Sequence, residues 1–261
     1  MNKNVKNMLS LGVCALFLLC FSLWGMLKED DALSLSERRP LKQFPSLSTQ
    51  EVLSGRFQSN FESYTLDQFP LRDTFRTLKA LAVRDLFREK DNNGIYVADG
   101  YAAKLDPALN ESSLDHAADR FRYVYETYLK DTDAKVYLSI IPDKNYFLAA
   151  ENGYPSLDYE RLFADMREKT DYAQYIDLTG ALSLSSYYRT DTHWRQEELL
   201  PVAKLLADTM GADLPEGFTS VTLGTPFSGV YRGQSALPMP PDTLTYLTND
   251  ALEGCRVYDY E

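Results

Sequence analysis

The first apolar segment of the chain is an uncharged run from Met8 to Leu27. As a helix, about 20 residues rising about 1.5 Å each extend for about 30 Å, the thickness of the hydrocarbon core of a bilayer. Lys3 and Lys6 precede the run, and the mostly acidic segment 28–31 follows it. This charge distribution predicts a cytoplasmic N-terminus and an extracytoplasmic remainder.

We therefore predict a single-pass protein of the cell membrane with an uncleaved signal anchor. Its parts are a cytoplasmic stub at 1–7, a transmembrane helix at 8–27, a tether at 28–48 and an extracytoplasmic domain at 49–261. The run is longer than a typical signal-peptide core, and no small-x-small cleavage site follows it. A cleaved signal peptide and a buried helix of a soluble protein remain the alternatives.

Helical periodicity begins at Thr49 and is interrupted at Pro70, which cannot continue a helix. Apolar residues on both sides of the proline follow the spacing of a single helix face. The first helix then has a stripe of Val52, Phe57, Phe61 and Tyr64, and the second, from Leu71, is expected to bury Phe75, Leu78, Ala82 and Leu86.

Strands and helices alternate through the rest of the chain. Strands are predicted at 95–98, 136–141 and 175–178, and helices at 112–130, 157–169 and 196–210, with "GCRVYDYE" as a closing strand. The helix at 112–130 is expected to bury Leu114, Ala117, Phe121, Val124 and Tyr128. Strand 136–141 is almost continuously apolar, as a central parallel strand is. The alternation predicts the α/β class, with sites in loops that follow strands.

The composition of the chain argues against several kinds of binding partner and cofactor. A net charge of −11 with no basic cluster argues against a nucleic-acid surface. Cys14 and Cys20 lie in the apolar leader and Cys255 is alone, so no disulfide framework is expected. The sequence predicts neither a metal nor a cofactor.

The stretch "YYRTDTHW" contains the most suggestive side chains. Asp191 and His193 lie two positions apart, so an extended backbone points both to the same side. A histidine acts as a general base near neutral pH when a carboxylate fixes its tautomer and stabilises the imidazolium. Trp194 follows directly and is a candidate to pack behind the imidazole or to shield it from water.

Other interpretations of the pair stay open. A zinc site needs more imidazoles than the two in this chain, although an Asp-x-His site completed by distant carboxylates is conceivable. A structural interpretation gives Asp191 a helix-capping role. His116 lies off the predicted buried stripe of its helix, and we assign it no function. A Ser–His–Asp site also needs a nucleophile, and no "GxSxG" or "GDS" motif occurs.

Five blocks in order resemble the bacterial DHHW proteins and, more distantly, the alginate O-acetyltransferase group of SGNH-hydrolase-like enzymes. The blocks are "SERRPLKQFPSLS", "GRFQSNFESYTLDQFPLRD", "IIPDKNYF", "YRTDTHW" and "FSGVYRGQSALPMPPDTLTYL", from about residue 36 to the end. Thr192 stands where the namesake motif has a second histidine.

The resemblance implies a three-layer α/β fold and acyl-ester chemistry on an extracytoplasmic polysaccharide. Asp191 and His193 would be two members of a catalytic triad. In that family the nucleophilic serine comes well after this motif, in a strand-to-helix turn, and the segment after Trp194 contains no such turn. The sequence is therefore expected to stop before its nucleophile, with an incomplete sheet and no activity of its own.

Three further residues are candidates to support the site. Lys144 in "PDK" can stabilise developing negative charge, and Arg189 has the same potential role. Tyr188, with Tyr187, suits a core or a sugar-binding rim. For each of these residues, a purely structural role is the alternative to a role at the site.

The predicted function is that of a membrane-anchored O-acyl transferase or esterase acting on a cell-surface or exported polysaccharide. A membrane acyltransferase is a candidate partner. The alternative is a non-catalytic glycan-binding or cell-envelope assembly module.

Overall fold

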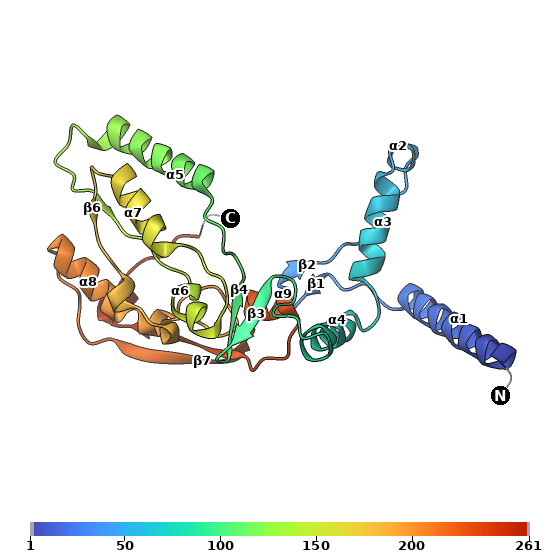
Figure 1. Ribbon diagram of the computed structural model, residues 1–261. Helices are drawn as coiled ribbons and strands as arrows, with labels where there is room; N and C mark the ends of the chain where they lie inside the picture. Colours follow the sequence, from blue (N-terminus) through green and yellow to red (C-terminus); the bar gives the residue numbers. More distant parts are fainter. Residues whose placement is uncertain (1–2, 260–261) are drawn as a thin grey trace. The chain divides into compact units, whose positions relative to one another are not determined.

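The computed structural model describes residues 3–259, and Figure 1 shows how their elements follow one another. The chain divides into two compact units, each described here by itself. The first contains Met1–Glu89 and Ala236–Pro238, and the second contains Lys90–Ser235 and Met239–Glu261.

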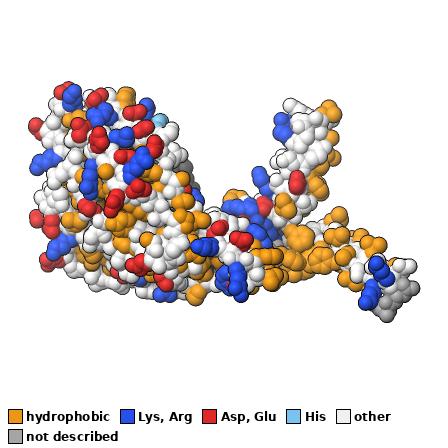
Figure 2. Space-filling model, viewed as in Figure 1, with side chains coloured by type: hydrophobic (Ala, Val, Ile, Leu, Met, Phe, Trp, Pro, Cys, Tyr) orange, Lys and Arg blue, Asp and Glu red, His pale blue; other side chains and the backbone are white. Residues whose placement is uncertain are grey.

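The first unit is mainly helical. Its elements are α1 (Lys3–Leu27), β1 (Leu33–Ser34), β2 (Arg39–Pro40), α2 (Thr49–Leu53), α3 (Arg56–Asp67), α4 (Arg72–Leu81) and a π-helical turn, η1 (Ala82–Leu86). α1 is long and apolar enough to cross a membrane by its length and composition, and Figure 2 shows hydrophobic side chains along it. One N-terminal apolar helix is therefore confirmed, in keeping with a signal anchor or a signal peptide.

The end of α1 packs against the junction between α3 and α4. The ring of Phe21 stacks on Phe69 with 5.5 Å between centroids and meets Phe75 edge-on at 5.7 Å. Gly25 faces Pro70, and a Cβ at Gly25 would be in ordinary van der Waals contact with the proline ring, at 3.6 Å. The proline that ends the first predicted helix thus also forms part of the contact with the apolar helix.

Side chains from the junction hold the segment that follows α1. The buried amide of Gln68 accepts from the Asp31 N–H at 2.9 Å and donates to the carbonyls of Asp31 and Lys42 at 2.9 and 3.1 Å. Arg39 forms a two-pronged ion pair with Asp67, at 2.9 and 2.6 Å, which lowers the pKa of that carboxyl to about 2. Residues 31–42 are therefore fixed to α3 along their length.

The apolar stripe of α4 does not face the interior, contrary to the sequence prediction. Phe75 is 37% exposed, Leu78 56% and Leu86 73%, whereas the small residue Ala80 is fully buried. Periodicity correctly groups the large apolar side chains on one face, but it does not determine what that face contacts.

The second unit begins with the hairpin of β3 (Ile95–Ala98) and β4 (Tyr101–Lys104). Asp99 and Gly100 form its two-residue turn with φ of 49° and 79°, the left-handed values of a type I′ turn. The unit continues with α5 (Glu111–Val124), η2 (Tyr125–Leu129), β5 (Tyr137–Leu138), α6 (Asn145–Leu148), η3 (Ala150–Asn152), α7 (Tyr159–Lys169) and β6 (Gln174–Tyr175).

The remaining elements surround the "YYRTDTHW" stretch in sequence. They are η4 (Thr179–Ala181), η5 (Leu184–Ser186), η6 (Gln196–Glu198), α8 (Leu200–Met210), β7 (Thr219–Phe227), α9 (Val230–Ser235), β8 (Asp242–Thr248) and α10 (Asp250–Glu253). β7 and β8 form an antiparallel pair that the sequence analysis did not predict. The described part of the expected closing strand, 254–259, contains no strand.

The fold is a mixture of helices and small sheets, so the α/β expectation is confirmed in its coarse form. Every sheet in residues 3–259 has two strands, and β5 pairs in parallel with β6. Only Tyr137 and Leu138 of the predicted strand 136–141 are in strand conformation, and Ile141 is 49% exposed. A continuous apolar run forms a long central strand only between neighbours on both edges, and here it has one.

Helix α5 also departs from its predicted packing. Phe121, Val124 and Tyr128 are 47%, 46% and 64% exposed, although their spacing marked them as core. His116 is exposed on α5. Ala118 is the buried residue of this helix.

Candidate functional site

The loop that contains Asp191 and His193 is a tight turn closed by backbone hydrogen bonds. The Tyr188 N–H donates to the His193 carbonyl at 3.1 Å, and the Arg195 N–H donates to the Ser186 carbonyl at 2.7 Å. Tyr187 and Trp194 face each other as an isolated antiparallel bridge. Residues 189–192, between the bonded Tyr188 and His193, therefore form the tip of a narrow loop.

Asp191 and His193 face each other across this tip. The Nδ1 atom of the imidazole lies 2.6 Å from Asp191 Oδ1, and the His193 N–H donates to the same oxygen at 3.0 Å. The Asp191 side chain is 1% exposed and the His193 side chain 75% exposed. The buried Asp191 carboxylate therefore holds the imidazole of His193 at Nδ1, while the rest of the ring is open to solvent.

The second oxygen of Asp191 is held by a distant segment. The Val230 N–H, at the start of α9, donates to Asp191 Oδ2 at 2.9 Å. The Tyr231 and Arg232 N–H groups donate to the Thr190 carbonyl at 3.0 and 3.2 Å. Asp191 and Thr190 thus satisfy N–H groups that a helix leaves without partners at its first turn.

Burial by itself raises the pKa of Asp191, but its hydrogen bonds outweigh that effect. Donation from the Val230 N–H and from His193 stabilises the carboxylate, so the net pKa lies below the ordinary value. Asp191 is therefore an ionised hydrogen-bond acceptor at neutral pH, as a residue that orients a histidine must be.

A second carboxylate holds the loop from the other side. Asp242, the first residue of β8, accepts from the N–H groups of Arg189 and Thr190 at 2.9 and 2.8 Å. It also accepts from the Thr190 hydroxyl at 2.5 Å. The sequence analysis did not identify Asp242, because no local motif marks a residue that lies about 50 positions from its partners.

Lys144 lies beneath the same loop. Its side chain is buried, at 2% exposure for the residue, and Nζ donates to the Tyr188 carbonyl at 2.6 Å. The ammonium also lies over the rings of Tyr101 and Tyr231, 5.8 and 5.3 Å from their centroids. Burial lowers the pKa of Lys144 to about 7, although the nearby Asp242, Asp191 and Asp143 carboxylates favour the charged form.

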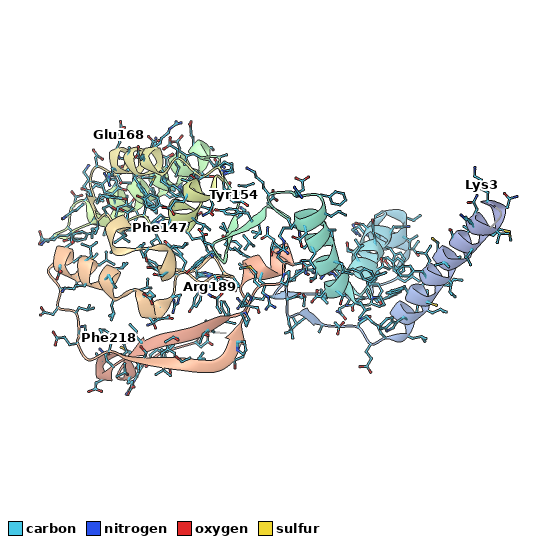
Figure 3. All side chains as sticks on the ribbon, turned by 60° about the horizontal axis from the view of Figure 1, so that its bottom comes forward. Lys3, Phe147, Tyr154, Glu168, Arg189 and Phe218 are labelled. Carbon is cyan, nitrogen blue, oxygen red and sulfur yellow. The ribbon has the colours of Figure 1, made fainter. Side chains whose placement is uncertain are left out.

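The other predicted supporting residues have different surroundings. The buried Tyr188 ring meets Phe227 edge-on at 5.3 Å. Trp194 packs against the core cluster of Ile176, Leu178, Leu182 and Val202. Arg189 is exposed, with its guanidinium 5.8 Å from the Tyr101 ring centroid, and it is labelled in Figure 3. Tyr188 and Trp194 therefore make contacts typical of packing.

No described serine forms a hydrogen bond with His193. The hydroxyl of Ser183 lies 2.9 Å from that of Ser185 and 3.4 Å from that of Ser186. Ser228 accepts a hydrogen bond from Arg232. Residues 3–259 therefore supply the oriented imidazole and its acid, and none of their hydroxyls hydrogen-bonds to His193.

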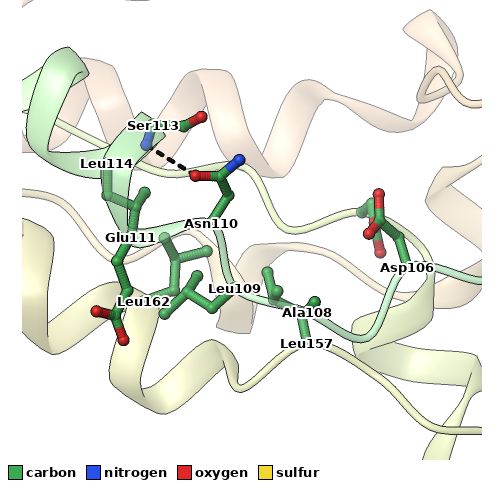
Figure 4. Close-up of a pocket in the computed structure, with 10 residues that line it drawn as sticks. Asp106, Ala108, Leu109, Asn110, Glu111, Ser113, Leu114, Leu157 and Leu162 are labelled. Atoms are coloured by element: carbon green, nitrogen blue, oxygen red, sulfur yellow. Dashed lines mark hydrogen bonds between the residues drawn. The ribbon is translucent and has the colours of Figure 1, made fainter.

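A cleft of about 860 Å³ opens beside the first turn of α5 (Figure 4). Its polar lining includes Asp106, Asn110, Glu111 and Asp143. Asp143 precedes Lys144 and accepts hydrogen bonds from the Tyr159 hydroxyl at 2.6 Å and the Asn145 N–H at 2.8 Å. Carboxylates and an amide are suitable partners for sugar hydroxyls. Within the described residues, no group of three or more metal-ligating side chains is arranged for a metal ion.

Solved structures from two bacteria resemble this fold. A DHHW family protein from Eubacterium siraeum DSM 15702 is 18% identical, with a TM-score of 0.48 over 60% of this chain and 55% of that one. Bacillus cereus PatB1 is 14% identical, with a TM-score of 0.44 over 60% of this chain and 59% of that one. The structure of PatB1 with a sulfonyl adduct is 15% identical, with a TM-score of 0.45 over 60% of this chain and 57% of that one.

A DHHW family protein is thus among the solved structures that this chain resembles. The chain spans less than two thirds of the length of each of these three solved chains. No family model matches the sequence, and no curated protein matches it.

Gly229 lies where the geometry leaves no room for a side chain. A Cβ there would lie 2.4 Å from Asp191 Cβ and 2.4 Å from the Thr190 carbonyl oxygen. We predict that Gly229→Ala separates α9 from the loop and lowers the free energy of unfolding by roughly 1–3 kcal/mol, as overpacking does. Thermal unfolding measures the loss. Gly224→Ala in β7, where a Cβ meets nothing within 4 Å, is the control, and equal stability of the two variants would contradict the prediction.

Proposed function

We propose that Asp191 and His193 are the acid and the general base of an acyl-transfer site on a membrane-anchored, extracytoplasmic SGNH-like protein. The supporting observation is that one buried carboxylate fixes Nδ1 of a solvent-exposed imidazole at 2.6 Å. This is the arrangement by which a carboxylate sets the tautomer of a catalytic histidine and stabilises its protonated form.

The proposed reaction is transfer of an O-acyl group, with acetyl as the expected case. Nε2 of His193 takes the proton from a serine hydroxyl as its oxygen attacks the acyl carbonyl carbon. The leaving oxygen then receives that proton, and an acyl-enzyme remains. A sugar hydroxyl or water, activated in turn by His193, releases the acyl group. Transferase and esterase differ only in this acceptor. The serine is a further part of the proposal, since no described hydroxyl bonds to His193.

The proposed substrate is a cell-surface or exported polysaccharide. The polar cleft lined by Asp106, Asn110 and Asp143 supports it, because those side chains can accept from or donate to sugar hydroxyls. Residues 8–27 form the proposed membrane anchor, with 28–48 as the tether and 49–261 as an extracytoplasmic domain of a three-layer fold. A membrane acyltransferase is the proposed protein partner, and no nucleic-acid partner is proposed.

A second candidate is a non-catalytic glycan-binding or cell-envelope assembly module. It is favoured by the capping role of Asp191 at α9, which by itself accounts for the burial of the carboxylate. On this interpretation His193 is an exposed side chain on a structural loop.

The two candidates differ in the activity of the protein expressed to its natural stop codon. For an acyl-transfer enzyme, p-nitrophenyl acetate turnover falls about 10⁴-fold in Asp191→Asn and further in His193→Ala, because the base loses its orientation or is removed. His116→Ala, at an exposed histidine on α5, retains full turnover and is the matched control.

Turnover that survives His193→Ala would remove the assigned base. The reading frame beyond codon 261 gives a second, independent test. An in-frame serine in a strand-to-helix turn supports the enzyme, while a stop codon together with absent turnover supports the binding module.

We also propose that Lys144 is a positioning residue for this loop. Its donation to the Tyr188 carbonyl and its proximity to Asp191 and Asp242 support the assignment. Lys144 Nζ acts through the Tyr188 backbone carbonyl, without reaching the reacting atoms.

The lowered pKa of Lys144 predicts how the free energy of unfolding changes with pH. Between pH 7 and 9 the unfolded chain holds the lysine proton and the folded chain releases it, so the free energy of unfolding rises with pH. Lys144→Met should remove this rise, which approaches about 1.4 kcal/mol per pH unit at most. Urea unfolding, followed by Trp194 fluorescence in a Trp24→Phe background, measures it. Lys204→Met, on the exposed face of α8, keeps the rise; an unchanged slope in Lys144→Met would refute the assignment.

A further inference from the structure

Helix α4 has its large apolar side chains on the outside. Phe75 and Leu78 are 37% and 56% exposed, and at about 100° per residue they lie about 60° apart on the helix, while Leu71, the residue just before α4, is 50% exposed. Ala80, about half a turn away from this stripe, is fully buried. A helix of a water-soluble surface normally has the reverse arrangement, and an exposed apolar stripe of this kind marks a surface suited to contact with another apolar phase.

The stripe is continuous with the apolar helix α1. Phe75 touches both Phe21 and Phe69, with centroid distances of 5.7 Å in each case. Phe21 lies six residues before the end of α1, which corresponds to about 9 Å along the helix. If α1 spans the bilayer, these contacts bring Phe69 and Phe75 to the depth of Phe21, below the headgroup layer.

Charged side chains flank the stripe without interrupting it. Arg72 and Arg76, on one side of α4, pair with Glu37 at 2.7 and 3.1 Å. Trp24, near the end of α1, is of the residue type that is enriched at the membrane–water interface. The polar flank and the apolar stripe together form the pattern of a helix that lies in the interface plane.

We propose that α4 lies in the outer surface of the cell membrane, with Leu71, Phe75 and Leu78 among the lipid chains. The occupant of the exposed stripe is the bilayer itself, because the stripe continues the apolar surface of α1. The proposal depends on α1 as the anchor and is independent of the chemistry of Asp191 and His193. It gives the first unit two attachments to the membrane, one spanning and one interfacial.

The test uses the whole chain, reconstituted in phosphatidylcholine–phosphatidylglycerol vesicles, with nitroxide labels on single cysteines. The background is Cys14→Ala, Cys20→Ala and Cys255→Ala, and the labelled sites are Leu71→Cys, at the residue just before α4, and Leu78→Cys within α4. We expect both labels to collide with lipid-dissolved oxygen and to be shielded from an aqueous nickel chelate at least several-fold. Glu62→Cys, on exposed α3, is the control and should show the opposite preference.

Two outcomes would overturn the proposal, and they are distinguishable. If alkaline carbonate leaves the protein in the vesicles but both α4 labels react with the nickel chelate, the anchor holds and α4 lies in water. If carbonate releases the protein, α1 is not an anchor and the basis of the proposal is lost. Two labelled sites guard against local misfolding at either one, and circular dichroism of each variant checks the fold.

Discussion

The carboxylate of Asp191 is shared between two partners, and the candidate site depends on that sharing. One oxygen binds the imidazole and backbone of His193, and the other accepts from the N–H of Val230. A buried carboxylate is stable only if its lone pairs are satisfied, so losing either partner leaves a costly unpaired charge. The same carboxylate therefore both orients the histidine and attaches α9 to the loop.

The surrounding groups prevent the loop from relaxing. Asp242 binds the backbone of Arg189 and Thr190, Lys144 binds the Tyr188 carbonyl, and Gly229 allows α9 to approach without a side chain between the two. Because these contacts come from separate segments, the loop is fixed by tertiary structure more than by its own turn. Such support is what keeps a functional side chain in a single rotamer while its ring stays exposed.

Local patterns predicted the parts of the site that are local. The spacing of Asp191 and His193 indicates that their side chains can meet, as they do at the loop tip, whereas the bond from Lys144 to the Tyr188 carbonyl joins positions that are 44 apart. Val230 and Asp242 lie 39 or more positions from the residues they bind, so no window of sequence indicates them. The same limit applies to the helices. Periodicity grouped Phe75 with Leu78 and Phe121 with Val124, but whether a face meets protein, lipid or water depends on segments elsewhere. For the same reason the strand predicted at 136–141 is longer than the strand in the structure, which contains only Tyr137 and Leu138.

The most direct test of the central claim is ¹⁵N NMR of the imidazole rings, since the chain has only two histidines. At a pH where both rings are neutral, His193 should carry its proton on Nδ1, with a hydrogen-bonded Nδ1 proton that disappears in Asp191→Ala, while the His116 signals stay unchanged. A His193 ring that carries its proton on Nε2 in the wild type, or whose signals are the same in Asp191→Ala, would contradict the account.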